Sequence, residues 1–393
     1  MRGARAEKGR PHLFALCVAI VLTAATLLAG RSVAIQRERS MARALAPEIF
    51  PVKTQGLALQ RAAAQAPDVL PLYGSSELLG PFFWRAPDFF RTAPTGFQVS
   101  GAGKAGASSL TMLQKIGALD RELRGKRVAV LLSSVWFLGR TTFYWYDGNF
   151  SRFAASAVIF NSGLDFHLKH DIAARMIQYP HTVEKSPLLA FALRRLASGK
   201  RLDHLAFCAI WPLGKMEDMI LDLQDHFAAL EALRGRESPP VFRPQKLDWT
   251  RLIAKAEQIT MERNKQKHAS TQAAEQRVMG SGDGWFREHM NRATEWVDLE
   301  LLLRTLKEVQ AQPLLISMPM NGPYYDALGI SAAGREDYYN KLQALAQRYN
   351  FELVDFADHD DDPNFLDPHL TAKGWILFDR VIDDFMHDHV PRT

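Results

Sequence analysis

Five short runs of apolar, β-branched or aromatic residues are spread along the chain, and most are bounded by glycine, proline or serine. They lie at residues 69–73, 97–99, 127–132, 314–318 and 351–354. Helical patterns occupy much of the space between them, over residues 106–123, 296–310, 334–349 and 372–387. Short buried strands that alternate with amphipathic helices predict an α/β fold, in which helices cover both faces of a parallel sheet.

Residues 147–295 interrupt this alternation, because they contain several amphipathic helical stretches and no convincing strand. We interpret this segment as a helical insertion between the third and fourth strands. The chain has 393 residues, of which 47% are hydrophobic, so it can bury a full core. We expect one main domain over residues 67–393.

Near the N-terminus, residues 13–30 carry no charge over eighteen positions. As a helix they would span ~27 Å, close to the thickness of a bilayer core. We predict a transmembrane anchor at 13–30, a cytoplasmic tail at 1–12 and a stalk at 31–66. A cleaved signal peptide is the alternative, since alanines near the end of the run would suit a signal peptidase.

The formal net charge is +5, and residues 1–43 alone contribute +6. The rest of the chain is therefore nearly neutral, which argues against a polyanion-binding surface on the main domain. The two cysteines, Cys17 and Cys208, are far apart in the sequence and form no zinc-binding pattern.

The first strand runs into Gly74-Ser75-Ser76-Glu77. In parallel sheets chemistry gathers at the carboxyl ends of strands, so one of these serines is a candidate nucleophile, and the alternative is a helix cap. Near the C-terminus, Asp367 and His369 lie in a proline-containing loop before the last helix. The order Ser, Asp, His is one of those that catalytic triads take on α/β folds.

Several motifs together resemble the DltD family of membrane-anchored, SGNH-hydrolase-like proteins, which take part in D-alanylation of teichoic acids and other envelope glycopolymers. The motifs are the Gly-Ser-Ser-Glu at 74–77, a glycine-rich loop at 101–110, Ser-x-x-Trp-Phe at 133–137, a Pro-x-Asn-Gly-x-Tyr-Tyr-Asp-x-x-Gly segment at 319–329 and His-Leu-x-x-Lys-Gly-Trp at 369–375. The resemblance implies an SGNH-like, flavodoxin-like sheet and a single-pass protein of the bacterial cytoplasmic membrane. The catalytic domain would then be extracytoplasmic.

By this resemblance Ser76 is the nucleophile, and Asp367 and His369 complete the triad. The backbone N–H groups of Ser76 and of Gly103 or Gly106 would form the oxyanion hole. One residue separates the Asp from the His here, whereas the family usually has two, and the shorter spacing resembles that of SGNH-type polysaccharide O-acetyltransferases. The third oxyanion donor stays unassigned. Candidate residues of the substrate cleft are Glu77, Trp136, Asn321, Tyr324 and Tyr325, and structural roles for Glu77 and the two tyrosines are the alternative.

The resemblance implies transfer of D-alanine from an acyl-serine to a hydroxyl group of teichoic acid, lipopolysaccharide or a similar polymer. A DltB-like membrane-bound O-acyltransferase and, indirectly, a D-alanyl carrier protein would be its partners. No cofactor or metal is expected, and the chain lacks a phosphate-binding Gly-Lys motif with which to activate alanine itself. An esterase or thioesterase with the same triad, and an inactive binding subunit, are the alternatives.

Overall fold

The computed structural model describes residues 10–79, 83–139, 143–237, 243–268 and 281–391. Its core is a five-stranded sheet with the strand order β2-β1-β3-β4-β5, and all neighbouring strands are parallel. The strands are β1 (Val69–Gly74), β2 (Gln98–Gly103), β3 (Arg127–Leu132), β4 (Gln312–Ser317) and β5 (Glu352–Asp355). The α/β fold and the five strands expected from the sequence are thus confirmed, and the order is that of flavodoxin-like sheets.

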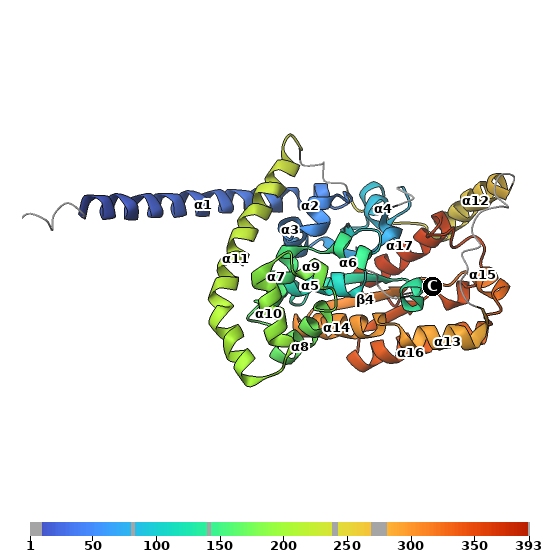
Figure 1. The fold of residues 1–393 in the computed structure, drawn as a ribbon. Helices are drawn as coiled ribbons and strands as arrows, with labels where there is room; N and C mark the ends of the chain where they lie inside the picture. The colour runs from blue at the N-terminus through green and yellow to red at the C-terminus, as the bar shows by residue number, and fades with distance from the viewer. Residues whose placement is uncertain (1–9, 80–82, 140–142, 238–242, 269–280, 392–393) are drawn as a thin grey trace, which may run out of the picture.

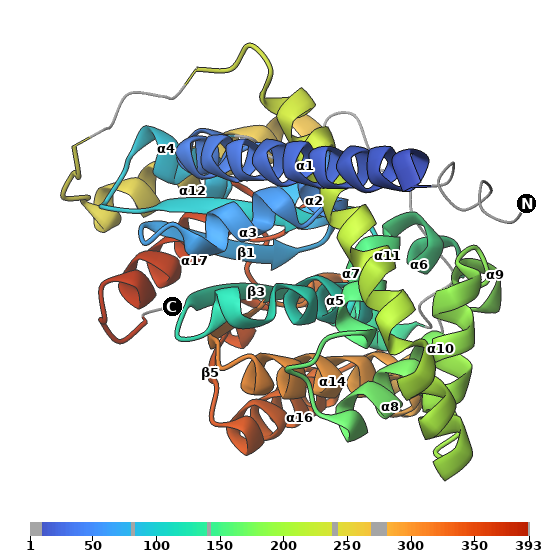
Figure 2. The same cartoon turned by 90° about the vertical axis from the view of Figure 1, so that its left-hand side faces the viewer.

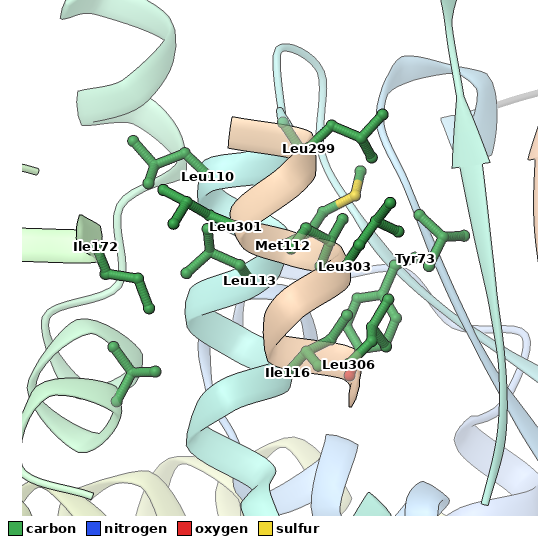
Figure 3. Packing of buried hydrophobic residues seen from close by; sticks show 14 of the residues in the cluster. Tyr73, Leu110, Met112, Leu113, Ile116, Ile172, Leu299, Leu301, Leu303 and Leu306 are labelled. Atoms are coloured by element: carbon green, nitrogen blue, oxygen red, sulfur yellow. The ribbon is translucent and has the colours of Figure 1, made fainter. Parts of the chain in front are cut away.

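One face of the sheet packs on α5 (Ser109–Leu119), α14 (Glu295–Glu308) and α16 (Ala332–Tyr349). Figure 3 shows leucines of α14 meeting Leu110, Leu113 and Ile116 of α5 beside Tyr73 of β1. These side chains and the strand residues Val128 and Val130 belong to the same buried cluster. Alternate residues of each strand supply this face, as the pleat of a strand requires.

The other face packs on α4 (Ala86–Thr92), α12 (Trp249–His268) and α17 (Ala372–Met386). Its strand residues are the alternate set, such as Leu72, Ala129 and Leu131. Because both faces are covered, the strands are nearly continuous apolar runs, and this is why they were recognisable in the sequence.

Among the described residues between β3 and β4 the regular elements are all helices, and Figures 1 and 2 show these helices beside the sheet. The elements that precede α12 are η3 (Ser134–Leu138), α6 (Phe143–Asn149), α7 (Arg152–Ile159), α8 (Phe166–Met176), α9 (Pro180–Val183), α10 (Pro187–Ala197) and α11 (Arg201–Leu233). Helix α13 (Gly282–Arg292) lies between α12 and α14. The longest of these, α11, has 33 residues.

The N-terminal helix α1 (Arg10–Leu45) covers both the expected anchor and the beginning of the expected stalk. It is the one helix, among the described residues, that is long and apolar enough to cross a membrane. From Ala34 onward α1 is partly buried against the body, and α2 (Pro51–Gln55) and α3 (Ala58–Gln65) continue the contact. Much of the segment 34–66 thus packs against the body, and the stalk remains a prediction.

Two ion pairs hold α1 on α11. Arg31 Nε lies 2.8 Å from Asp222 Oδ2, and Glu38 Oε1 lies 2.8 Å from Nδ1 of the buried His226. Burial opposes the charge on His226, but its hydrogen bonds to Asp222 and Glu38 outweigh burial and raise its pKa to about 9. The imidazole is thus protonated at neutral pH, and the pairs fix the angle at which α1 leaves the body.

The carboxyl ends of β1 and β2 approach each other through two glycines. Gly74 pairs with Gly103 in the ladder, and a Cβ on Gly103 would lie 2.2 Å from the carbonyl oxygen of Gly74. Backbone cannot yield as a flexible side chain can, so only glycine fits at position 103.

We expect Gly103→Ala to lower the free energy of unfolding by about 1–3 kcal/mol, because the added methyl group must push the two strand ends apart. Gly148→Ala is the matched control, since a Cβ at Gly148 meets no atom within 4 Å. Urea unfolding of the full chain in detergent, followed by tryptophan fluorescence, measures both. Equal midpoints for the two variants would contradict the close approach.

Candidate active site

All the segments with candidate residues follow carboxyl ends of strands and lie at one edge of the sheet. They are η1 (Ser76–Leu79) after β1, the loop 104–108 after β2, η3 after β3, α15 (Gly322–Ala327) after β4 and the loop 356–371 after β5. Strand β2 lies on one side of β1, whereas β3, β4 and β5 follow on the other side. The order of the strands therefore reverses between β1 and β3. Ligands of open α/β sheets bind at such a point, outside the carboxyl ends of the strands.

The structure distinguishes the two serines that follow β1. Ser75 is 1% exposed, its N–H group donates to a carboxylate oxygen of Glu77, and its hydroxyl donates to the carbonyl of Lys104 at 3.4 Å. Ser76 is partly exposed, and within the described residues its hydroxyl makes no hydrogen bond. No N–H group of η1 donates to either hydroxyl within this part of the chain, so neither serine acts as a side-chain cap there. Ser76 is the serine with an accessible oxygen.

Glu77 lies beneath the turn. Its side chain is 1% exposed, and a Cβ on Gly74 would lie 2.7 Å from its Oε1 atom. Burial raises the pKa of Glu77 to about 7, and the hydrogen bonds from the N–H groups of Ser75 and Glu77 limit the rise. Glu77 thus supports the backbone of the turn from below.

The single 3₁₀ turn of η1 follows β1, and α4 begins only at Ala86 with Pro87 in its first turn. One short turn has few aligned peptide dipoles, so individual N–H groups must provide any stabilisation of negative charge at Ser76.

The loop after β2 makes a tight turn over Lys104–Ala107. The N–H group of Ala107 donates to the carbonyl of Lys104 at 2.9 Å, and Gly106 has a φ of +77°. A positive φ at the third position of a turn favours glycine. A Cβ on Gly106 would also lie 2.1 Å from the ring of Trp145, so the indole covers this glycine closely.

Helix α6 supports this loop through polar contacts. The amide nitrogen of Asn149 donates to the carbonyl oxygens of Ala105 and Trp145, both at 3.0 Å. Lys104 Nζ donates to the carbonyl of Gly148 at 2.8 Å. No sequence motif predicted a role for Lys104, Trp145 or Asn149, and the one nearby signal is the aromatic run at 143–146 that contains Trp145.

Asp367 and His369 lie in one narrow turn with Pro368 at its tip. Leu366 pairs with Leu370 as an antiparallel bridge, and the N–H group of Asp367 donates to the carbonyl of His369 at 2.7 Å. Partial burial lowers the pKa of His369, which favours the neutral imidazole that a general base requires.

This turn is fixed to the body on both sides. Lys373 Nζ lies 2.8 Å from Glu257 of α12 and 2.8 Å from Asp362, and the hydroxyl of Thr371 accepts a hydrogen bond from the N–H group of Gly374 at the start of α17. Leu370 and Leu78 are buried in the same cluster, so the turns that carry His369 and Ser76 rest on the same core. Within the described residues the Ser76 hydroxyl and the His369 imidazole are not hydrogen-bonded to each other.

The remaining candidates take mixed positions. Asn321 is exposed, and its side-chain oxygen accepts a hydrogen bond from the N–H group of Tyr324, which caps α15. Tyr325 is 4% exposed and packs on Phe286, with ring centroids 5.9 Å apart, so it belongs to the core under the loop. Tyr324 and Trp136 are partly buried against the same cluster.

Comparison with known proteins shows the family of this chain. The chain is 26% identical to "Protein DltD" of Bacillus subtilis over 361 aligned residues, and this alignment covers 89% of each chain. It is 22% identical to "Protein DltD" of Staphylococcus aureus over 84% of each chain, and 22% identical to that of Lacticaseibacillus rhamnosus over 94% of this chain and 89% of the other. Residues 46–387 match the family described as "DltD protein", and the chain therefore belongs to the DltD family.

Proposed function

We propose that this protein transfers D-alanine to hydroxyl groups of an envelope glycopolymer through an acyl-enzyme on Ser76. The DltD family is involved in D-alanylation of teichoic acids, which gives the acyl group and the class of acceptor. The single observation that carries the assignment to Ser76 is the contrast at 75–76: Ser75 is buried and hydrogen-bonded, while Ser76 presents an accessible hydroxyl at the strand end.

In the proposed mechanism, His369 takes the proton of Ser76 Oγ as this oxygen bonds to the carbonyl carbon of an activated D-alanyl ester. The leaving group departs with that proton, and the acyl group stays on Ser76. A polymer hydroxyl then gives its proton to His369 and attacks the acyl carbon. The bond from this carbon to Ser76 Oγ breaks, and His369 returns the proton to Oγ. Asp367, in the same turn, orients His369 and stabilises its protonated form.

Backbone N–H groups stabilise the negative oxygen that forms in each step. We assign this role to the N–H group of Ser76 and to that of Gly103 or Gly106, since β1 and β2 end side by side. The contacts of Asn149 and Trp145 hold the loop of Gly106 in place. Loss of one such donor typically costs on the order of 10²-fold in rate.

The acceptor would meet an aromatic wall beside this loop. Tyr144 and Trp145 of α6 are 72% and 43% exposed, and exposed ring faces of this kind pack well on the C–H faces of sugars or polyols. We propose that α1 is retained as a single membrane anchor and places the body outside the cytoplasmic membrane. A DltB-like membrane-bound O-acyltransferase would then supply the alanyl group, which reaches it from a carrier protein.

The first test measures alkali-labile D-alanine in envelopes of cells that carry the native protein, Ser76→Ala, Ser75→Ala or no protein. We expect Ser76→Ala to match the deletion, because no acyl-enzyme can form. Ser75→Ala is the matched control and should keep most of the D-alanine, since the change removes one hydrogen bond of 3.4 Å.

Normal D-alanine in the Ser76→Ala cells would contradict the proposal and would indicate an inactive binding subunit. The full chain purified in detergent separates transfer from hydrolysis. There we expect Ser76→Ala to lose about 10³-fold or more in kcat/KM on a short acyl ester. Fast hydrolysis with no transfer to any added polyol or glycopolymer would favour the esterase alternative.

The acid limb of kcat/KM should have its midpoint below 6.5, the ordinary pKa of histidine. Burial lowers the pKa of His369, so the neutral base persists to lower pH and activity falls only as the pH drops through this lowered value. The pH profile of ester cleavage by the full chain measures it.

Glu77→Gln is the control for this profile, because the pKa of Glu77 is about 7. The amide oxygen of the glutamine can still accept the hydrogen bond from the N–H group of Ser75. We therefore expect the midpoint of the acid limb to stay below pH 6.5 in this variant. A limb near pH 7 that disappears in Glu77→Gln would instead assign the controlling proton to Glu77.

A further inference from the structure

The outward face of α11 carries a stripe of large apolar side chains. The α11 stripe consists of Leu202, Leu205, Leu213, Met216, Ile220 and Phe227, which are between 52% and 80% exposed. Their spacing follows multiples of three to four residues, so they share one side of the helix. At ~1.5 Å per residue the stripe is ~37 Å long.

The opposite side of α11 is firmly packed. Phe207, Gly214 and Asp218 are buried, and a Cβ on Gly214 would lie 2.3 Å from the ring of Phe160. At ~100° per residue, none of the charged residues between positions 201 and 227 projects within about 60° of the centre of the stripe. The stripe is thus a continuous apolar surface on a rigidly held helix, and exposed surfaces of this size indicate an interaction site.

The position of α11 relative to α1 indicates what covers the stripe. The large apolar side chains of α1 are exposed as far as Val33, and the contact with α11 begins with the pair Arg31–Asp222. In both overall views α11 runs steeply across α1, and Figure 1 shows it at the edge of the body from which α1 emerges. If α1 crosses a bilayer, its uncharged residues fill the hydrocarbon core, and α11 lies at the level where the helix leaves it.

Basic residues stand at both ends of the stripe. Lys200 and Arg201 precede it, Arg234 follows it, and all three are exposed. Interfacial helices combine an apolar face with basic residues that reach the phosphate groups of lipids. Within α11 itself acidic side chains outnumber basic ones, and Arg234 lies 3.9 Å from the exposed Glu231. The apolar pattern of α11 and its position beside α1, with Lys200 and Arg201 at one end, are therefore what favour a lipid surface.

We propose that α11 is an interfacial helix whose stripe inserts into the same bilayer that holds α1. The inference rests on α1 being retained as an anchor, and it is independent of the chemistry at Ser76. With one membrane contact the body could rotate about the axis of α1. A second contact, joined to the first by the Glu38–His226 and Arg31–Asp222 pairs, removes that freedom and sets one orientation of the body on the membrane.

The test places a fluorescent label on the stripe. The full-length protein with Cys17→Ser and Cys208→Ser receives Met216→Cys, or His204→Cys as the matched control, and is labelled with bimane in vesicles of phosphatidylglycerol and phosphatidylcholine. Met216 and His204 are both exposed residues of α11, but His204 lies away from the stripe. We expect doxyl-labelled lipid to quench the label at Met216 and iodide to quench it several-fold less than the label at His204.

Equal access of iodide to both labels would overturn the proposal. A label at Met216 that is open to iodide in vesicles but protected in native membranes would also overturn it, in favour of a protein partner on the stripe. The intact mass of the purified protein separates this result from failure of the anchor. Loss of residues of α1 would contradict the proposed anchor, whereas full mass with an iodide-accessible label contradicts the interfacial helix alone.

Discussion

The site depends on the contact between the ends of β1 and β2, where the backbone at Gly74 leaves no room for a side chain at Gly103. Because these two strands end in register, the turn with Ser76 and the loop with Gly106 start from the same point of the sheet edge. A one-residue shift of this pairing would move one segment by ~3.3 Å relative to the other. The proposed nucleophile and its proposed N–H donors can therefore be placed by main-chain geometry alone, and the side chains of Glu77 and Asn149 hold the two segments there.

Much of the fold could be predicted from the sequence, because buried parallel strands are short apolar runs that glycine or proline often ends. All five strands and α5, α14, α16 and α17 lie where these patterns placed them. The turn that carries Ser76 is a single 3₁₀ turn, and α4, with Pro87 in its first turn, starts only at Ala86. The packing of residues 34–66 on the body could not be predicted from local patterns, since Glu38 pairs with His226, 188 residues away.

The candidate site shows the same division. Ser76, Asp367 and His369 were assigned through motifs that resemble the DltD family, and without that resemblance Ser75 and Ser76 were equal candidates. Trp145 and Asn149 carry no such signal, because their importance comes from contact with a loop more than forty positions earlier in the chain. Residues that hold a site in position are harder to predict than residues that react. Almost any side chain of suitable size and polarity can support a loop, whereas few side chains can act as nucleophile or base.

The openness of the site bears on how transfer could prevail over hydrolysis. His369 keeps an exposed part next to Pro368 although neighbouring groups partly remove water from its imidazole, and Ser76 is only partly covered. Water can therefore reach both atoms that the mechanism uses, and water is a competent acceptor for an acyl-serine. Transfer to a polymer requires that the acceptor or a membrane partner cover this edge and displace the water while the acyl group is present. An orientation fixed by two membrane contacts favours such a closure, because each encounter then presents the same edge of the sheet to components of the same membrane.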